Sequence, residues 1–163
     1  MSIDRARQHL AQFGADGRIR ETPQSSATVE LAAAAIGTQP CRIAKTLSFW
    51  LPDGPILVVV AGDARIDNRA YIQRFGTKAR MLKPDEVEAT TGHVVGGVCP
   101  FGVKAGVRIF LDESLRRFET VFPACGSGNS SIEVTINELE RFSGYDGWVQ
   151  VTKLPDGEEN VGS

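Results

Sequence analysis

The sequence predicts an α+β fold, with a mixed, partly antiparallel and curved sheet flanked by helices. Apolar residues recur at helical spacing in some segments, whereas in others they alternate or run together as in strands. Two neighbouring strands are joined by a short turn and should pair as an antiparallel hairpin. Helices and strands then interleave along the rest of the chain, which favours a mixed sheet with helices against its faces.

Two helices are expected at the start of the chain. Apolar residues recur near helical spacing over residues 3–13, and Gly14 follows as a stop. An alanine-rich second helix should begin at Ser26 or Thr28 and end at Ile36, before a glycine. Its small side chains predict close packing against a sheet.

The hairpin comes next. Strands are expected at residues 42–51 and 56–61, because residues 52–55 between them are strong turn formers. The run 56–60 is continuously apolar and rich in β-branched residues, which is typical of a central strand buried on both faces. We therefore expect the core to form around it.

The second half of the chain alternates helices and strands. In order, we expect a helix at 67–75 capped by Asp67, a short strand at 79–82, a helix from Pro84 to Gly92, a loop to Gly102, strands at 107–111, 120–122 and 131–135, a helix at 137–142 and a strand at 148–151. Aspartate is a preferred cap, and proline is favoured in the first turn of a helix.

Composition limits the possible functions. The chain has 163 residues, of which 42% are hydrophobic, enough for one well-packed domain. With 18 basic and 20 acidic residues, the net charge of -2 excludes a broad basic surface for long nucleic acids. Three cysteines without CxxC spacing indicate neither a disulfide framework nor a zinc site, and a reducing cytoplasm fits best. No apolar run reaches membrane-spanning length.

One local cluster of positive charge could receive phosphates. Between Ala64 and Pro84 the only acid is Asp67, and the basic residues are Arg65, Arg69, Arg74, Lys78, Arg80 and Lys83. The alternative is an ordinary solvated helix face, which charge alone favours somewhat.

Lys45 occupies an unexpected place in the strand at 42–51. The two-residue period puts Ile43, Leu47 and Phe49 on one face. Lys45 shares that face. Burying an ammonium without a partner is costly, so such a lysine meets a carboxylate, lines a solvent-filled cleft or binds an anion. We pursue the cleft. The alternative is a lysine near a strand end that keeps its stem on apolar surface and its amine in water.

Two glycine-rich loops could bind an anion. The segment 92–102 contains four glycines and a proline, and the segment 125–131 offers hydroxyls, an amide and glycine N–H groups. Backbone N–H groups in such segments can form an anion cradle or an oxyanion hole. Either loop taken alone is more often just a turn.

Familiar catalytic motifs are absent. The sequence has no phosphate-binding loop, dinucleotide fingerprint, nucleophile elbow or HExxH helix. Only His9 and His93 are present, without metal-ligand spacing, so neither a metal nor another cofactor is expected. Cys99 and Cys125 lie in or beside the loops and could be nucleophiles or redox switches. Since neither cysteine has an evident base beside it, we favour the interpretation that both are small buried residues without a chemical role.

Four features together have the order and spacing of a known family. They are residues 42–47 with Lys45, Gly62-Asp63 with Asp67, the Gly96-x-x-x-Pro100 loop, and Gly126 to Asn129 ahead of a strand. In this combination the chain resembles the YbaK family of prolyl-tRNA synthetase-associated editing domains. The resemblance covers roughly residues 20–152, which we take as the core of a single domain spanning residues 1–163. Where relatives carry basic residues or histidine after the later glycines, this chain has Asn129, Ser130 and Ser131.

The resemblance implies a YbaK-like fold and a cleft that hydrolyses the ester between a wrong amino acid and the 3′ end of a tRNA, without a metal. By that analogy Lys45 is the essential lysine, and N–H groups around Gly96 and Gly97 face the oxyanion. The other residues expected at the substrate are Thr46, Asp63, Val98, Cys99, Pro100, Phe101, Gly102, Gly126, Ser127 and Asn129. The implied partners are the acceptor end of an aminoacyl-tRNA, such as mischarged tRNA-Pro, and prolyl-tRNA synthetase.

Two other functions fit the same residues. A non-catalytic module that holds the acceptor end of tRNA or a synthetase would need the same anion cradle. An unrelated esterase would act on simple esters without tRNA. The sequence predicts neither the edited amino acid nor the oligomeric state.

Overall fold

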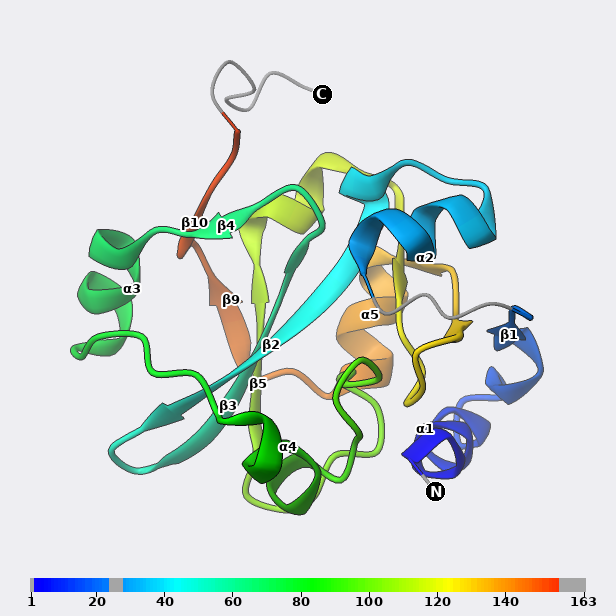
Figure 1. Ribbon diagram of the computed structural model, residues 1–163, viewed down its shortest axis with the longest axis horizontal. Helices are drawn as coiled ribbons and strands as arrows, with labels where there is room; N and C mark the ends of the chain where they lie inside the picture. The colour runs from blue at the N-terminus through cyan, green and yellow to red at the C-terminus, as the bar shows by residue number, and fades with distance from the viewer. Residues whose placement is uncertain (1, 24–27, 156–163) are drawn as a thin grey trace.

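A six-stranded mixed sheet forms the centre of the protein, with the strand order β8-β6-β2-β3-β5-β9 (Figure 1). The computed structural model describes residues 2–23 and 28–155. The strands of this sheet are β2 (Ile43–Leu51), β3 (Gly54–Ala61), β5 (Arg108–Asp112), β6 (Thr120–Pro123), β8 (Val134–Thr135) and β9 (Gly147–Val149). Two small antiparallel sheets pair β1 (Arg20–Glu21) with β7 (Ser130–Ser131), and β4 (Arg65–Ile66) with β10 (Thr152–Lys153).

The sheet combines both strand directions, as the sequence predicts. β2 and β3 pair as an antiparallel hairpin over their whole length, whereas β5 runs parallel to β3 and β6 runs parallel to the start of β2. From Ile56 to Ala61 no residue of β3 has exposed surface. The prediction that this segment is the buried central strand is therefore confirmed.

The described residues form five α-helices around the sheet. They are α1 (Ser2–Ala11), α2 (Val29–Ile36), α3 (Asn68–Phe75), α4 (Pro84–Thr91) and α5 (Ile136–Ser143). The side chain of Thr28 caps α2 by accepting the N–H of Leu31, and Asp67 caps α3 in the same way. α4 ends at Gly92, whose φ of 90° suits a residue without a Cβ. The other predicted start of the second helix, Ser26, lies outside the described residues.

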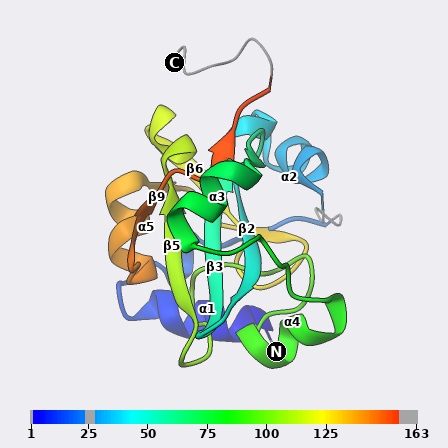
Figure 2. The same ribbon diagram turned by 90° about the vertical axis from the view of Figure 1, so that its left-hand side faces the viewer.

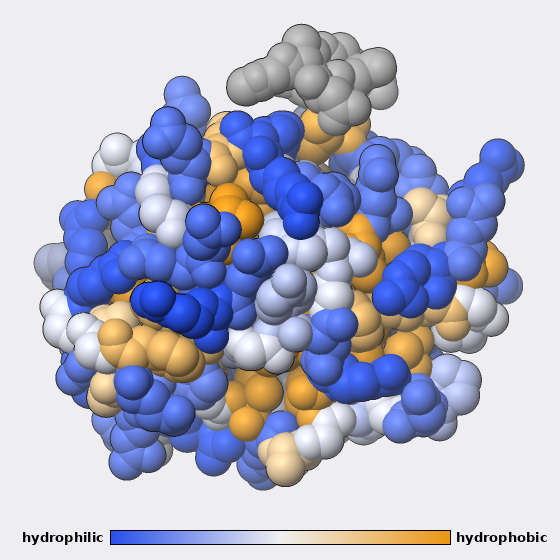
Figure 3. All heavy atoms as spheres, turned by 180° about the vertical axis from the view of Figure 1, so that it is seen from behind, coloured by the Kyte–Doolittle hydropathy of each residue, from blue (hydrophilic) through white to orange (hydrophobic). Residues whose placement is uncertain are grey.

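The helices lie on both faces of the sheet. Figure 2 shows α5 on one side of the strands and α2 and α4 on the other. Aromatic rings connect these layers: Phe13, just after α1, packs on Phe142 of α5 with ring centroids 5.0 Å apart, and Phe49 of β2 packs on Tyr71 of α3 at 5.1 Å. Seen from behind, the surface is mostly hydrophilic, with hydrophobic residues scattered among the polar ones (Figure 3).

Several expected elements differ from the structure. The strand predicted at 131–135 is divided between β7 and β8, which belong to different sheets. The segment 79–82 makes only a single bridge, between Met81 and Phe49. The first helix ends at Ala11, two residues early, and the two-residue strands β1, β4 and β10 were not predicted. Such short pairings depend on distant partners, so the local pattern does not reveal them.

No helix in the described part of the chain is long and apolar enough to cross a membrane.

Candidate functional site

A pocket of about 320 Å³ opens along one edge of β2. Its walls come from α2, α4, the end of β6 and the two glycine-rich loops. The lining residues are Thr28, Val29, Ala32, Ile36, Ile43, Ala44, Lys45, Thr46, Leu47, Ser48, Met81, Leu82, Pro84, Val87, Val95, Gly96, Val98, Phe122, Ala124, Ser127, Ser130 and Ser131. Lys45 therefore shares one pocket with both loops that the sequence analysis selected.

The pocket exists because the sheet is incomplete along this edge. β6 pairs with β2 only at Ile43 and Ala44, which lie opposite Phe122 and Pro123. The carbonyl of Pro123 faces the other way and accepts the N–H of Ile132. Further along β2, the N–H of Trp50 and the carbonyl of Ser48 bond to the segment before α4. Between these two pairings, no strand of the described chain neighbours residues 45–47 on this side.

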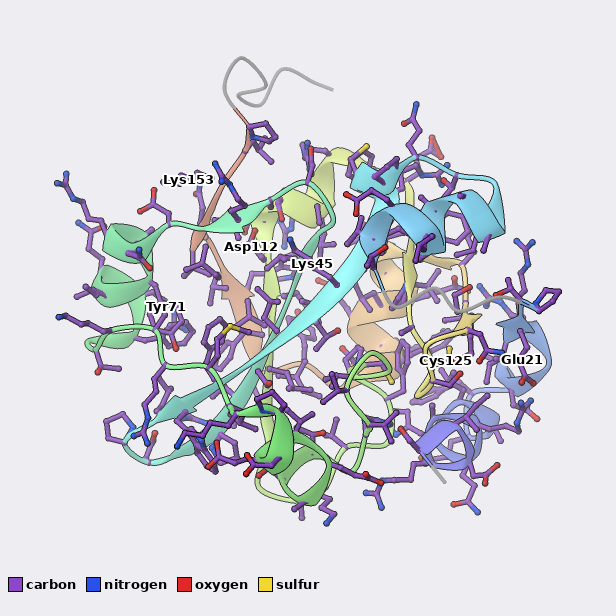
Figure 4. All side chains as sticks on the ribbon, viewed as in Figure 1. Glu21, Lys45, Tyr71, Asp112, Cys125 and Lys153 are labelled. Carbon is purple, nitrogen blue, oxygen red and sulfur yellow. The ribbon has the colours of Figure 1, made fainter. Side chains whose placement is uncertain are left out.

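Lys45 is half-buried on this open edge of β2 (Figure 4). Within residues 2–23 and 28–155 its amine makes no hydrogen bond and no ion pair. Burial lowers the pKa of Lys45, and the nearby carboxylate of Asp63 partly opposes this effect. A cation that has lost part of its hydration without gaining a protein partner is suited to binding an anion or a polarised oxygen.

Asp63 does not line the pocket. Its carboxylate binds the guanidinium of Arg117 through two contacts, of 2.5 and 3.1 Å, and both side chains are mostly buried. Asp63 therefore acts on Lys45 from a distance while a second cation holds it in place. The expectation that Asp63 contacts the substrate stays a prediction.

A tight turn shapes the first glycine loop where it meets the pocket. The N–H of Gly97 donates to the carbonyl of Val94 at 2.9 Å, so Val95 and Gly96 occupy the centre of the turn. Gly96 has φ 90°, a conformation that side chains disfavour. The N–H of Gly97 is thus engaged within its own loop, and the role expected for the N–H groups around Gly96 and Gly97 stays a prediction. In the described chain the N–H of Gly96 has no such partner.

The two loops touch at their glycines. A Cβ built on Gly97 would lie 2.4 Å from the carbonyl carbon of Gly126, much closer than real contacts allow. Beyond this point, the hydroxyl of Ser127 donates within its own loop, to Asn129 or Ser130. Asn129 in turn bonds through its side chain to the backbone of Thr22.

His93 braces the first loop from inside the protein. It is fully buried, one ring nitrogen lies 2.7 Å from the carbonyl of Phe101, and the other lies 2.9 Å from the hydroxyl of Ser2. The Ser2 hydroxyl also accepts the N–H of Val94. Burial lowers the pKa of His93, which favours the neutral ring. The sequence analysis did not assign His93 this structural role.

The second half of the first loop faces the protein interior. Cys99 and Phe101 have no exposed surface, and Pro100 is buried. Gly102 packs against the backbone of Arg5 in α1, whose side chain donates to the Gly102 carbonyl at 2.8 Å. Burial raises the pKa of Cys99 to about 12, and it also raises the pKa of Cys125. Both thiols are therefore protonated at neutral pH and are poor nucleophiles. The Sγ of Cys99 lies 3.5 Å from Nε2 of His93, which corrects the expectation that no base stands beside it, but neither residue lines the pocket.

Of the predicted site residues, five line the pocket: Lys45, Thr46, Gly96, Val98 and Ser127. The others are not among its lining residues: Asp63, Gly97, Cys99, Pro100, Phe101, Gly102, Gly126 and Asn129. The hydroxyl oxygen of Thr46 is itself buried, with no hydrogen-bond partner in the described chain.

The sequence analysis missed the apolar half of the pocket. Val29, Ala32 and Ile36 of α2 pack with Ile43 and contribute to its wall. The small apolar side chains of this helix predicted packing against the sheet. The same side chains can also line a pocket, and the sequence pattern does not distinguish the two. Met81 and Val95 were also missed. For Val95 a usable signal existed, namely an apolar residue within a glycine-rich turn.

Among the described lining residues, Lys45 is the only charged one, and no carboxylate, imidazole or thiol is present. The serine hydroxyls at the pocket have no adjacent base to activate them. The arrangement can therefore bind an electron-rich group beside a cation and a backbone N–H. Among the described residues it provides no activated protein nucleophile.

Comparison with known proteins gives consistent matches. A family model described as "Aminoacyl-tRNA editing domain" matches residues 23–142. The "Uncharacterized protein YwhH" of Bacillus subtilis is 53% identical over 154 residues, which cover 94% of this chain and 98% of that protein. The Enterococcus faecalis protein named "Putative Cys-tRNA(Pro)/Cys-tRNA(Cys) deacylase EbsC" is 29% identical over 109 residues, 66% of each chain.

A solved structure has the same fold. It is titled "Crystal structure of a putative trans-editing enzyme for prolyl tRNA synthetase" and superimposes with a TM-score of 0.84 at 29% sequence identity. The match covers 93% of this chain and 97% of that one.

Proposed function

This chain belongs to the aminoacyl-tRNA editing domain family, and from that premise we propose that it removes a wrongly attached amino acid from tRNA by hydrolysing the aminoacyl ester. The names of the similar proteins refer to Cys-tRNA deacylation and to prolyl-tRNA synthetase, which supports a mischarged tRNA-Pro or a similar tRNA as substrate. The observation that carries the proposal is the unpaired Lys45 in a pocket shared with both glycine loops.

Such an editing site compensates for the limited ability of a synthetase to distinguish similar amino acids. Amino acids that differ by one methylene are separated by only about 10- to 200-fold in a hydrophobic pocket, so a second hydrolytic site is needed. The aminoacyl ester is already reactive. The site must therefore hold the acceptor end, stabilise the developing oxyanion and admit a water molecule, but it needs no strong nucleophile.

In the proposed reaction, Lys45 binds the terminal phosphate or polarises the ester carbonyl. The N–H of Gly96 faces the oxyanion as water attacks the carbonyl carbon. Because no acid or imidazole lines the described pocket, a substrate group such as the neighbouring ribose hydroxyl assists the water. The ester C–O bond then breaks, releasing the free amino acid and the 3′ hydroxyl of the tRNA.

Deacylation of a panel of tRNAs carrying alanine, cysteine, serine or threonine tests the proposal. We expect release of at least one of these amino acids, and a decrease on the order of 100-fold or more in Lys45→Ala, by analogy with the loss of an oxyanion donor. Lys153→Ala is the matched control, because Lys153 is an exposed lysine on β10, which does not contribute to the pocket (Figure 4).

Three results would contradict the proposal. Near-normal turnover by Lys45→Ala removes the lysine from the mechanism. Binding of the charged tRNAs without release of any amino acid favours a non-catalytic module. Hydrolysis of simple amino acid esters at the same efficiency as aminoacyl-tRNA favours a general esterase.

A further inference from the structure

Two strongly exposed apolar side chains stand at the Lys45 pocket. In the described chain five large hydrophobic residues are exposed: Phe13, Leu31, Ile72, Met81 and Val95. Val95 and Met81 are the most exposed of them, at 61% and 55%, and these two line the pocket whereas the other three do not. Apolar surface held at the entrance of a site costs solvation free energy, so it indicates contact with a ligand.

Met81 is held in place by the backbone around it. The N–H of Trp50 donates to the carbonyl of Arg80 at 2.8 Å, and the N–H of Leu82 donates to the carbonyl of Ser48 at 3.2 Å. These bonds form the bridge that sets Met81 opposite Phe49 of β2. Leu82 is buried while Met81 remains exposed, so Met81 is not needed to fill the core.

Val95 is held in a comparable way on the opposite segment. It occupies the centre of the turn closed by Val94 and Gly97, next to Gly96. Turn positions favour glycine, proline, asparagine, aspartate and serine, and a β-branched apolar residue gives the turn no local advantage. A contribution to folding therefore does not explain why either position carries an apolar side chain.

We propose that Met81 and Val95 form the contact site for the nucleobase of the substrate's 3′-terminal nucleoside. This inference rests on the proposed function and extends it to the part of the substrate outside the ester. If the ester lies at Lys45, then the ribose and base continue from it toward the exposed end of the pocket. A base has flat apolar faces, and two exposed apolar side chains can cover them without reading base edges.

The charges around Met81 fit the same occupant. Arg80 and Lys83 flank it in sequence, and both are exposed, where they can meet the phosphates that precede the terminal nucleoside. The carboxylate of Glu86, at the start of α4, is already engaged by the indole of Trp50 and the N–H of Lys83. No acidic residue lines the described pocket.

Binding of a substrate analogue that cannot be hydrolysed tests the site. We would titrate 3′-deoxy-3′-alanylaminoadenosine, in which an amide replaces the ester, and follow its dissociation constant by NMR. A second ligand is the same amide on a sugar without the base. Met81→Ser and Val95→Ser should each weaken binding of the nucleoside on the order of tenfold, from lost apolar contact, and leave the base-free ligand unchanged.

Leu31→Ser and Ile72→Ser are the matched controls, because these residues are also exposed but lie outside the pocket lining. Unchanged binding of the nucleoside by the Met81 and Val95 variants overturns the inference, as does an equal loss in the controls. Equal weakening of both ligands places the amino acid, not the base, at these side chains. If the Met81 and Val95 variants lose binding of the nucleoside as expected but the wild-type protein deacylates no tRNA, the base site stands and only the proposed function is refuted.

Discussion

Gly97 lies directly against Gly126, so the two loops of the pocket are in backbone contact. A Cβ on Gly97 would also lie 2.5 Å from the backbone nitrogen of Ser127. Both neighbours are main-chain atoms, which cannot rotate away as a flexible side chain can. The spacing between the loops, and hence the position of Gly96 in the pocket that it shares with Lys45, depends on the absence of one methyl group.

Gly97→Ala should therefore separate the loops. We expect a loss of about 1–3 kcal/mol in the free energy of unfolding, as in other overpacked sites, together with a clear decrease in deacylation. Gly17→Ala is the control, because a Cβ at Gly17 meets nothing within 4 Å. Urea unfolding and the tRNA assay measure both effects. Equal behaviour of the two variants would mean that the contact is not required.

The pH dependence of activity should report on Lys45. If protonated Lys45 is needed, activity decreases as pH rises through its pKa, which burial sets below the ordinary value of 10.5. Asp63 raises this pKa, so Asp63→Asn should move the decrease to lower pH. The measurement is kcat/KM across the alkaline range, after subtraction of uncatalysed hydrolysis.

Asp53→Asn is the matched control for this shift, because Asp53 pairs with Arg108 at an exposed site on the β2–β3 hairpin. A profile that Asp63→Asn leaves unmoved would indicate that the charge of Lys45 does not limit the reaction.

His93 should make stability depend on pH. Its folded-state pKa lies below the unfolded value of 6.5, chiefly through burial, while Arg5 and His9 lower it further and the contacts to Phe101 and Ser2 raise it. The unfolded chain therefore binds the proton more readily. The stabilisation is complete above about pH 6.5 and is lost as the pH falls toward the folded-state pKa.

His93→Gln removes this component. We expect the variant to unfold more easily at neutral pH, by about 1–3 kcal/mol for disrupted buried hydrogen bonds, with a smaller change between neutral and mildly acidic pH. Denaturant unfolding of both proteins at several pH values gives the difference, in which contributions shared by the two chains cancel. If the free energies of unfolding of the two proteins changed with pH in parallel, the prediction would be contradicted.

The thiols should divide into one accessible and two protected groups. Cys41 is partly exposed, whereas Cys99 and Cys125 are buried, and burial raises the pKa of all three thiols. A thiol reagent should modify one cysteine quickly in the native protein and all three after denaturation. The Cys99→Ser, Cys125→Ser double variant should keep its turnover if it folds, and a folded but inactive variant would instead support covalent catalysis.

Much of the fold could be predicted from local patterns. Alternation and turn chemistry predicted the hairpin of β2 and β3, and an unbroken apolar run predicted the central strand. As expected, Asp67 caps the start of α3 and Gly92 ends α4. These features follow from periodicity and capping, which act over a few residues. The same reasoning gave the α+β class and the unusual position of Lys45.

The sequence by itself thus determined most of the helices and the central strands, the family resemblance and the prediction that Lys45 belongs to the site. The tertiary structure alone decided which loop residues face the pocket: Cys99 and Phe101 turn inward, the N–H of Gly97 is used in a turn, and Met81 and Val95 stand at the exposed wall. The physical reason is that a loop's orientation is set by contacts with distant segments, here α1 and the second glycine loop, and no short-range pattern encodes those contacts.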